Sequence, residues 1–324
     1  MRGAGAGAGP GPTHGPRSAS VGGRATRVGL VVHAGRPAAV EAARSLVSWL
    51  RGQGLSVRCL AGEPDLGDEA RDPESFPHGL DLVVSVGGDG TLLRAAHLAS
   101  RSDAPVLGVN VGRLGFLTEV GPDEAPALLD RVLEGRARIE ERLAVVARPR
   151  GAPWREPQWA LNEVIVEKRA RHRLVTLAAR IGGEYVTTFS ADGVIVATPT
   201  GSTAYSFSAR GPIVSPRASC LVLTPVSPHM VFDRSIVLAP EEGVTLEVIG
   251  DEPGLLSADG RPGLELPVGS TVHIEASDRP ARLVRREGTS FFTLLREKFQ
   301  LPGEPRGLVP PDASGLEPPG GDDR

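Results

Sequence analysis

Cysteine is scarce in this chain of 324 residues, which contains only Cys59 and Cys220. Two cysteines so far apart form neither a disulfide scaffold nor the paired ligands of a structural zinc site. Both lie in apolar stretches, so we expect buried structural thiols. Unpaired thiols are typical of a reducing compartment, and the sequence therefore predicts a cytoplasmic protein.

The sequence also lacks the long apolar run of roughly 18 residues that a membrane-spanning helix needs. The segment 1–23 has no continuous apolar stretch of the kind found in secretory signals. Charge is nearly balanced, with 36 Lys and Arg against 39 Asp and Glu and a formal net charge of −3. Nothing here predicts nucleic acid or a membrane surface as a partner. No Walker A lysine pattern is present, which excludes a P-loop mechanism.

A packed core is nevertheless expected, because 40% of the residues are hydrophobic. In the first half of the chain, apolar strands alternate with helices of one apolar face. This alternation predicts a parallel α/β sheet, with ligands at the carboxyl ends of its strands. The expected strands are 27–33, 55–60, 82–86 and 105–110, and the expected helices are 37–50, a helix opening at Thr91, and 123–133.

The pattern changes near Ala137, after which strands and turns dominate as far as Glu287. We therefore expect a β-rich second domain, closed by a helix over 291–299 that packs back toward the N-terminal domain. The predicted organisation is a disordered leader 1–24, an α/β domain 25–136, a β-rich domain with the terminal helix 137–301, and a disordered tail 302–324.

The most informative stretch is Gly87-Gly88-Asp89-Gly90-Thr91, which follows the apolar strand 82–86. Three glycines permit positive φ and close approach of a ligand to the backbone. The helix that follows offers free N–H groups to an anion such as phosphate. A carboxylate in such a turn repels phosphate unless it takes a proton or touches a metal ion, so Asp89 points to phosphoryl transfer. The alternative is an acidic residue in an ordinary strand-to-helix turn.

A second stretch, Thr198 to Pro212, is dense in hydroxyl groups and contains Tyr205. Hydroxyls and one aromatic ring suit a flat polar ligand with many hydrogen-bonding sites. The alternative is a loop whose hydroxyls satisfy only the local backbone. Two Asp-Gly dipeptides, at Asp192 and at Asp259, are weak signals that mark turns.

Asn162 and Glu163 open an otherwise apolar strand. An amide pairs with an adenine edge by offering a donor and an acceptor together. A carboxylate accepts hydrogen bonds from ribose hydroxyls, as the acidic residue of dinucleotide-binding folds does. The alternative is simply a polar start to a strand.

Taken together and in this order, these motifs resemble the NAD kinase family, which phosphorylates the 2′-hydroxyl of the adenosine ribose of NAD. Gly87 to Thr91 marks only the wider superfamily, which includes diacylglycerol kinases and phosphofructokinase-like enzymes. The more specific stretches are Gly112 to Glu119, Asn162-Glu163 and Thr198 to Pro212. The resemblance covers roughly residues 26–301, and it implies a kinase that converts NAD to NADP.

The resemblance also implies roles for the matching positions. Asp89 would be the general base for the ribose hydroxyl, Gly90 would line the diphosphate, and Arg94 would lie near the phosphates. Asn162 would bind adenine and Glu163 the ribose hydroxyls. The other implied binding residues are Thr203, Ala204 and Tyr205 for adenine and its ribose, Ser206, Phe207 and Ser208 in the same loop, Asp192 for the nicotinamide half, and Arg173 for a neighbouring polar group.

The implied phosphoryl donor is ATP or polyphosphate, with a divalent metal ion, most simply Mg²⁺, that arrives with ATP. Members of the family form dimers or tetramers, so we expect a homo-oligomer. The chain departs from the family pattern at Arg210, where glycine is usual, and at Arg261, where some members have a neutral amide. Arg210 is expected to alter the loop or add a positive charge near the donor phosphates. Two other functions stay open: a lipid or sphingoid kinase, and an inactive dinucleotide-binding regulator.

Overall fold

The computed structural model describes residues 27–113, 115–288 and 290–303. The predicted leader 1–24 and nearly all of the predicted tail 302–324 lie outside these residues. Over the residues that the structure describes, the chain divides into two compact units, 27–288 and 290–303. The second unit contains α5 (Phe291–Phe299), whose first turn is capped by Ser290, since the hydroxyl of Ser290 accepts a hydrogen bond from the backbone N–H of Thr293 at 3.1 Å. The expected terminal helix is therefore confirmed, and its packing toward the N-terminal domain stays a prediction.

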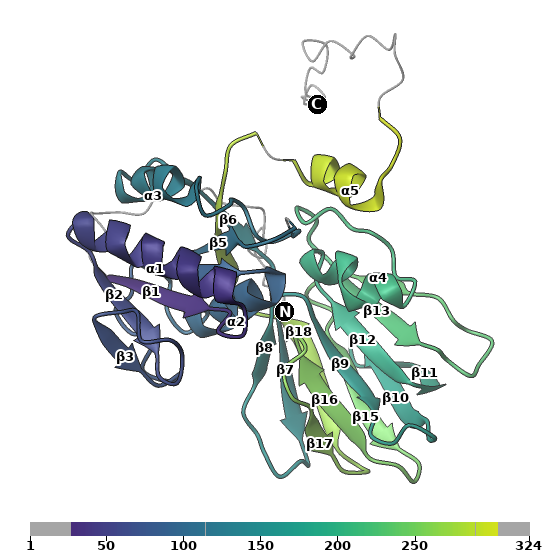
Figure 1. Cartoon of the computed structure of the whole chain (residues 1–324). Helices are drawn as coiled ribbons and strands as arrows, with labels where there is room; N and C mark the ends of the chain where they lie inside the picture. Colours follow the sequence, from purple (N-terminus) through teal and green to yellow (C-terminus); the bar gives the residue numbers. More distant parts are fainter. Residues whose placement is uncertain (1–26, 114, 289, 304–324) are drawn as a thin grey trace, which may run out of the picture. The chain divides into compact units, whose positions relative to one another are not determined.

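A seven-stranded sheet organises the first half of the chain, in the order β3-β2-β1-β4-β5-β19-β6 (Figure 1). Every neighbouring pair is parallel except β19 and β6, which are antiparallel. The predicted parallel α/β sheet is thus confirmed. Its strands are β1 (Arg27–Val32), β2 (Ser56–Leu60), β3 (Glu69–Arg71), β4 (Leu82–Gly87), β5 (Val106–Asn110), β6 (Arg138–Arg142) and β19 (Ala281–Arg285).

Two strands of this sheet, β6 and β19, come from the range 137–301 that the sequence analysis assigned to the second domain. The chain leaves the sheet after β6 and returns to it at β19. A division of the sequence into two continuous stretches cannot describe such a path. The predicted domain boundaries otherwise stay a prediction.

Helices cover both faces of this sheet. Alternate residues of each strand face opposite sides, so Leu30 and Val84 lie in one hydrophobic cluster while Val31 and Val83 lie in another. The first cluster contains buried side chains of α1 (Pro37–Gly52) and α3 (Ala125–Leu133), and the second contains those of α2 (Asp89–Ala99). The second cluster also includes Trp159, so the β-rich part of the chain packs on the α2 side of the sheet.

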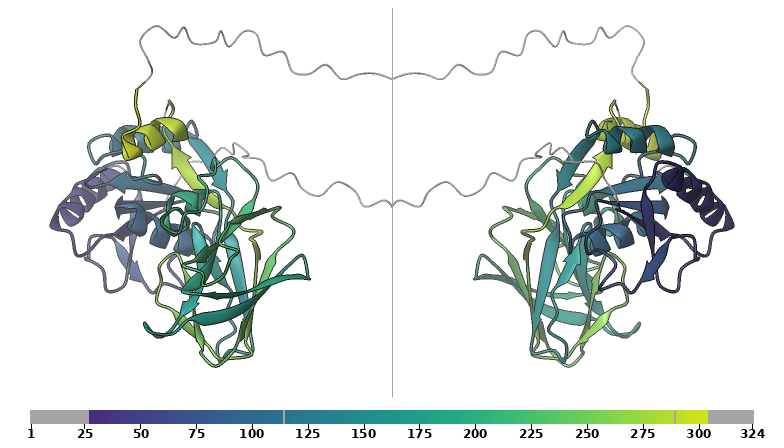
Figure 2. Two further views of the ribbon diagram at one scale, coloured as in Figure 1. Left: turned by 90° about the vertical axis from the view of Figure 1, so that its right-hand side faces the viewer. Right: turned by 90° about the vertical axis from the view of Figure 1, so that its left-hand side faces the viewer.

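The β-rich part consists of two six-stranded antiparallel sheets, as predicted. Their orders are β11-β10-β15-β18-β7-β8 and β14-β13-β12-β9-β16-β17. Buried side chains of both sheets form one cluster, so the core of this part lies between them (Figures 1 and 2). The strands are β7 (Val145–Arg150), β8 (Gln158–Ala160), β9 (Glu163–Lys168), β10 (Val175–Ile181), β11 (Glu184–Ala191), β12 (Gly193–Ala197), β13 (Leu221–Val226), β14 (Ile236–Leu238), β15 (Val244–Ile249), β16 (Gly254–Ala258), β17 (Leu264–Leu266) and β18 (Thr271–Ala276).

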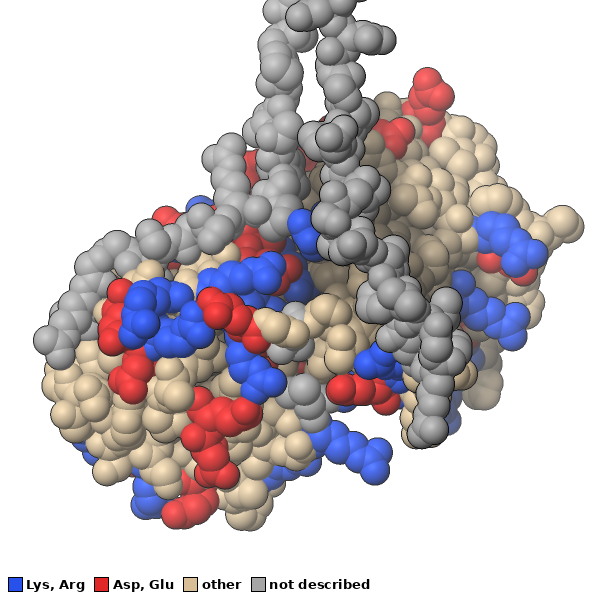
Figure 3. Space-filling model, turned by 90° about the horizontal axis from the view of Figure 1, so that it is seen from above, with Lys and Arg blue, Asp and Glu red and all other residues tan. Residues whose placement is uncertain are grey.

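Cys59 and Cys220 are both buried and unbridged, as expected, and burial raises the pKa of both thiols. Within the described ranges, no helix has the length and apolar character needed to cross a membrane. The face seen in Figure 3 carries acidic and basic side chains interspersed with one another.

Candidate active site

The Gly-Gly-Asp-Gly motif forms the junction between β4 and α2. β4 ends at Gly87, Gly88 is the extended N-cap residue with φ −122° and ψ −169°, and Asp89 is the first residue of α2. The expectation of positive φ here is wrong, because none of the three glycines has a positive φ. Gly87 is instead required by close packing, since a Cβ there would lie 2.3 Å from the Oγ1 of Thr91. A Cβ at Gly88 or Gly90 would meet nothing within 4 Å, so both face open space.

The carboxylate of Asp89 faces the loop that follows β5. Its Oδ2 accepts the backbone N–H of Phe116 at 2.8 Å, and its Oδ1 accepts those of Leu117 and Thr118 at 3.2 and 3.1 Å. The hydroxyl of Thr118 donates a fourth hydrogen bond to the carboxylate, to Oδ1 at 3.3 Å. The loop approaches so closely that a Cβ on Gly115 would lie 1.8 Å from Oδ1. One carboxylate therefore holds the Gly-Phe-Leu-Thr stretch that the sequence analysis singled out.

An open cavity of about 870 Å³ lies where β1 and β4 end. β1 and β4 are neighbours, but the chain continues from β1 to β2 on one side and from β4 to β5 on the other. Such a change of direction at the carboxyl ends is where open α/β sheets bind ligands. The lining residues are Val32, His33, Ala34, Gly35, Arg36, Pro37, Gly88, Gly90, Thr91 and Arg94.

His33 and Arg36 line this cavity, although the sequence motifs did not predict them. They follow β1 directly, and only the pairing of β1 with β4 places them beside the glycine motif. Their position directly after the first strand was the one signal in the sequence that they lie at the ligand-binding edge of the sheet. The guanidinium of Arg36 donates a hydrogen bond to the carbonyl of Val111, so it joins the cavity to the loop after β5.

Arg94 lines the cavity, one helical turn after Gly90, and its place near the phosphates stays a prediction. Its guanidinium pairs with Glu63 at 2.5 Å and donates to the carbonyl of Val32 at 2.8 Å. Glu63 also accepts the N–H of Val32 at 3.0 Å. Burial raises the pKa of Glu63, while the N–H of Val32 and the charge of Arg94 act against that rise. Nearly half of the Arg94 side chain stays exposed, which leaves it accessible to an anion in the cavity.

A second Asp-Gly turn holds Asn162 and Glu163. The carboxylate of Asp259, between β16 and β17, accepts the N–H groups of Leu161 and Asn162, each at 2.8 Å, and of Glu163 at 3.3 Å. Burial raises the pKa of Asp259, while these N–H groups and Arg261 act against the rise. The Asp-Gly dipeptide at Asp259 predicts only a turn, because nothing local shows which distant backbone a carboxylate will bind.

Arg261, the second departure from the family pattern, donates a hydrogen bond to the carbonyl of Trp159. Burial lowers the pKa of the partly buried His97 to about 4, and the positive charges of Arg261 and Arg101 add to this effect. The His97 and Trp159 rings lie 6.2 Å apart. Arg261 therefore supports the segment that leads into Asn162.

Glu163 is buried, with 8% of its surface exposed. The backbone N–H of Tyr205 donates to its carboxyl group, whereas Oε2 has no partner among the described residues. Burial, together with the nearby Asp259, raises the pKa of Glu163 to about 8. Glu163 is therefore largely protonated near neutral pH, with one buried oxygen available to a ligand.

The hydroxyl-rich stretch forms the short helices η1 (Thr200–Thr203) and α4 (Tyr205–Ser208). Its hydroxyls bond to both local and distant groups, so the alternative of a loop that satisfies only its local backbone describes just part of the stretch. Thr198 donates to the carbonyl of Leu161 at 2.6 Å, and Ser202 to that of Pro199 at 2.7 Å. The hydroxyl of Ser206 lies 3.2 Å from that of Thr224.

Other members of this stretch face outward. The exposed fractions of Tyr205 and Phe207 are 42% and 38%, and Ser208 is exposed, whereas Thr203 and Ala204 are half-buried. Burial of part of the ring raises the pKa of Tyr205, with smaller contributions from Glu167, Asp192 and Glu163. Tyr205 therefore lies beside a group of carboxyls that includes Glu163.

Arg210 takes the left-handed backbone conformation, with φ 66°. This is the conformation that glycine adopts most easily, so the arginine bears backbone strain here. The effect of Arg210 on the loop and on the donor phosphates stays a prediction. The Arg210 side chain is exposed.

Asp192 and Arg173 differ in how they relate to these groups. Asp192 pairs with Lys168 and contributes to the raised pKa of Tyr205, so it lies near the hydroxyl-rich loop. Arg173 is largely exposed and pairs with Glu252 at 3.3 Å. Their roles toward a ligand stay predictions, as do those of the other expected site residues.

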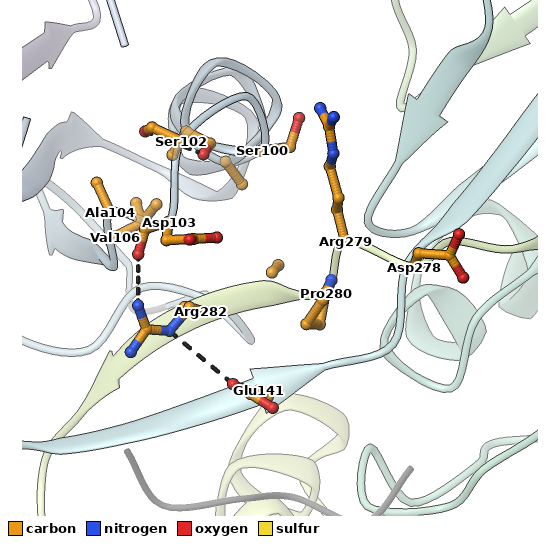
Figure 4. Close-up of a pocket in the computed structure, with 13 residues that line it drawn as sticks. Ser100, Ser102, Asp103, Ala104, Val106, Glu141, Asp278, Arg279, Pro280 and Arg282 are labelled. Atoms are coloured by element: carbon orange, nitrogen blue, oxygen red, sulfur yellow. Dashed lines mark hydrogen bonds and ion pairs between the residues drawn. The ribbon is translucent and has the colours of Figure 1, made fainter. Parts of the chain in front are cut away.

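A separate cavity of about 350 Å³ lies at the opposite end of α2 (Figure 4). Arg282 donates to the carbonyl of Asp103 and lies 4.0 Å from Glu141. Ser100, Asp278 and Arg279 also line it, but none of the motif residues does. The motifs therefore favour the cavity beside Gly88 and Gly90 as the active site.

Comparison with known proteins agrees with the motifs. The model of the ATP-NAD kinase N-terminal domain matches residues 68–137, and that of the ATP-NAD kinase C-terminal domain matches residues 161–286. The NAD kinase of Syntrophotalea carbinolica is 39% identical over 282 residues, which cover 84% of this chain and 98% of that protein. The chain belongs to the NAD kinase family.

Further relatives support this assignment. NAD kinase 2 of Streptomyces avermitilis is 42% identical over 86% of this chain and 96% of its own length. The crystal structure of an NAD kinase from Archaeoglobus fulgidus in complex with ATP has a TM-score of 0.69 and 28% identity, covering 86% of this chain and all of that one. The structure of yeast NADH kinase complexed with NADH shares the fold, with a TM-score of 0.80 and 23% identity over 88% of this chain and 90% of its own.

Proposed function

We propose that this NAD kinase transfers the γ-phosphoryl group of ATP to the 2′-hydroxyl of the adenosine ribose of NAD, giving NADP. The observation that carries the proposal is the Glu163 carboxyl, which is held by the N–H of Tyr205 and has a buried oxygen without a partner among the described residues. A ribose hydroxyl satisfies that oxygen. Asn162, held in place by Asp259 through its backbone, binds adenine in this proposal.

Asp89 is the proposed general base. Its Oδ1 accepts three hydrogen bonds, whereas Oδ2 accepts one, from Phe116. A carboxylate oxygen has about two lone pairs, so Oδ2 is the atom that can also accept the ribose proton. As that proton moves to Oδ2, the ribose oxygen forms a bond to the γ-phosphorus. The bond from that phosphorus to the bridging oxygen breaks, and ADP leaves.

The donor phosphates bind in the cavity beside Gly88 and Gly90. Both glycines face open space, and Arg36 and Arg94 supply positive charge. The amino end of α2 adds backbone N–H groups aimed at an anion. Polyphosphate presents the same chemistry, so the cavity suits either donor.

Mg²⁺ reaches the site with ATP in this proposal. Over the residues that the structure describes, no three His, Cys, Asp or Glu side chains form a group that holds a metal ion. The phosphate oxygens of the donor are the hard ligands that suit Mg²⁺. The bound ion neutralises charge on the donor phosphates.

In this proposal the protein is cytoplasmic and forms a homo-oligomer. The edge strands β11 and β14 expose apolar side chains, with Tyr185 56% and Val237 58% exposed. Size-exclusion chromatography with light scattering measures the oligomeric state, and cell fractionation measures the compartment.

The deciding experiment incubates the full chain with Mg²⁺ and either ATP or polyphosphate. The acceptor is NAD in one arm and diacylglycerol in vesicles in the other. We expect NADP in the first arm and no phosphorylated lipid in the second. A phosphorylated lipid identifies a lipid kinase instead, and calorimetric binding of NAD without NADP formation identifies an inactive regulator.

A further inference from the structure

Four buried charged side chains run in alternating sign from the first sheet to the hydroxyl-rich loop. Arg285 lies 2.8 Å from Glu119 and 3.4 Å from Glu140. Arg142 lies 2.9 Å from the other oxygen of Glu140 and donates to the hydroxyl of Thr200 at 3.2 Å. At most 8% of each charged side chain is exposed. We name this series, from Glu119 to Thr200, the charged relay.

One end of the charged relay meets the loop that Asp89 holds. Glu119 accepts the backbone N–H of Arg286 at 2.8 Å, and Arg285 lies 3.4 Å from the carbonyl oxygen of Leu117. The N–H of that same Leu117 donates to Asp89. Asp89 and Arg285 therefore both hydrogen-bond to the backbone of Leu117, in the loop that follows β5.

The other end of the charged relay meets the proposed NAD loop. Thr200 is the first residue of η1, and its carbonyl accepts the hydroxyl of Thr203 at 3.4 Å. Two residues later the N–H of Tyr205 reaches Glu163. Arg142 thus contacts the start of the segment whose end donates a hydrogen bond to the Glu163 carboxyl group.

Burying four charges is costly unless every one is paired, and apolar residues often give equal stability. Burial acts to raise the pKa of Glu140, but the charges of Arg142 and Arg285 lower it overall. Glu119 has one close arginine, and burial raises its pKa. Pairing therefore favours the charged form most strongly at Glu140, which lies between both arginines. Such an arrangement fixes relative position more than it adds stability.

We propose that Arg142 is a positioning residue, which through Thr200 holds the 198–208 loop in the position that NAD binding requires. The charged relay thereby connects this loop to the one held by Asp89. It keeps the bound NAD ribose and Asp89 at a fixed relative position. This role rests on the proposed function, because it specifies how the same site is held.

The test uses Thr200→Val, which removes only the hydroxyl and leaves all four charges paired. A second variant, Arg142→Met with Glu140→Gln, removes one opposite-charge pair together. Loss of a hydrogen bond from a charged donor should raise the KM for NAD about tenfold in either variant, with the KM for ATP unchanged. Combining the three substitutions should raise the KM for NAD no further, because both variants break one connection.

Thr245→Val is the matched control. This substitution also removes one threonine hydrogen bond, to His273 at 3.0 Å. That bond joins β15 and β18, in an antiparallel sheet of the β-rich part. We expect its KM for NAD to equal that of the wild type. The proposal fails if Thr200→Val behaves like this control, or if the effects of the two relay variants multiply.

Hydrogen exchange separates this proposal from the proposed function. Amides of residues 200–205 should exchange about tenfold faster in Thr200→Val, with the rest of the chain unchanged. If the wild type forms no NADP, the proposed function fails, and exchange still tests the role of Arg142. Unchanged exchange in this segment overturns the positioning role whatever the activity.

Discussion

Asp89 and Asp259 hold their loops by the same pattern of hydrogen bonds, but in different surroundings. Each aspartate precedes a glycine, and each carboxylate accepts three consecutive backbone N–H groups. Asp89 opens a helix beside a large cavity, whereas Asp259 lies in a tight turn next to the buried Glu163. A carboxylate that holds a loop can therefore be a general base or a purely structural residue, and its access to a ligand distinguishes the two.

Backbone strain also differs between the two halves. In the described residues before 200, no residue other than glycine has a positive φ. Arg210 and Asp259 both do, with φ of 66° and 49°. The half that holds the proposed NAD loop therefore carries strain that the glycine motif around Asp89 avoids.

Replacing Asp89 with Asn should have the largest effect. An amide keeps one acceptor oxygen for the loop but cannot take a proton, so kcat should fall by about 10²-fold or more. NADP formation at saturating NAD and ATP measures it. Asp259→Asn is the control, and its kcat should change far less. Equal losses of kcat in both variants would make Asp89 a support like Asp259.

Asp259→Ala should give the next largest effect. Three N–H groups lose their acceptor, and Asn162 and Glu163 lose their anchor. We expect a loss of about 3 kcal/mol in the free energy of unfolding and a higher KM for NAD. Urea denaturation and steady-state kinetics measure the two. A variant as stable as the wild type would show that water replaces this carboxylate without cost.

Glu163 should make stability depend on pH. Its pKa is about 8 in the folded chain against an ordinary value of 4.5, so the folded chain keeps a proton that the unfolded chain has released. This stabilisation is complete below pH 4.5 and is lost as the pH rises through 8. The decline is at most about 1.4 kcal/mol per pH unit.

Denaturation of the wild type and of Glu163→Gln at several pH values isolates this effect. The wild type should lose stability relative to the variant as the pH rises from 4.5 toward 8. Parallel pH profiles would mean that Glu163 is ionised in the folded chain.

The smallest expected effect is that of Arg210→Gly. Glycine relieves the left-handed strain but loses more backbone entropy on folding, so stability should rise by about 0.5–1 kcal/mol. Thermal unfolding measures it. Ser208→Gly, in α4 where no positive φ is needed, should instead reduce stability.

The strands β1, β2, β4 and β5 and the helices beside them followed from periodicity, because these strands are buried on both faces and each helix has one apolar face. β3 was not expected, since its side chains are largely exposed. β6 and β19 did not follow, since nothing in 138–142 or 281–285 says that these strands pair across more than a hundred residues. Pairing between distant strands depends on the whole chain path.

The sequence alone determined the chemistry: a carboxylate at a helix start, an Asn-Glu pair, and a hydroxyl-rich loop with one tyrosine. It determined these because residue types and short spacings carry chemical identity. Only the tertiary structure decided which oxygen of Asp89 stays available, that Asp259 anchors Asn162 and Glu163, and that Arg142 reaches Thr200. Those contacts join residues far apart in the chain, and folding alone fixes which polar groups meet.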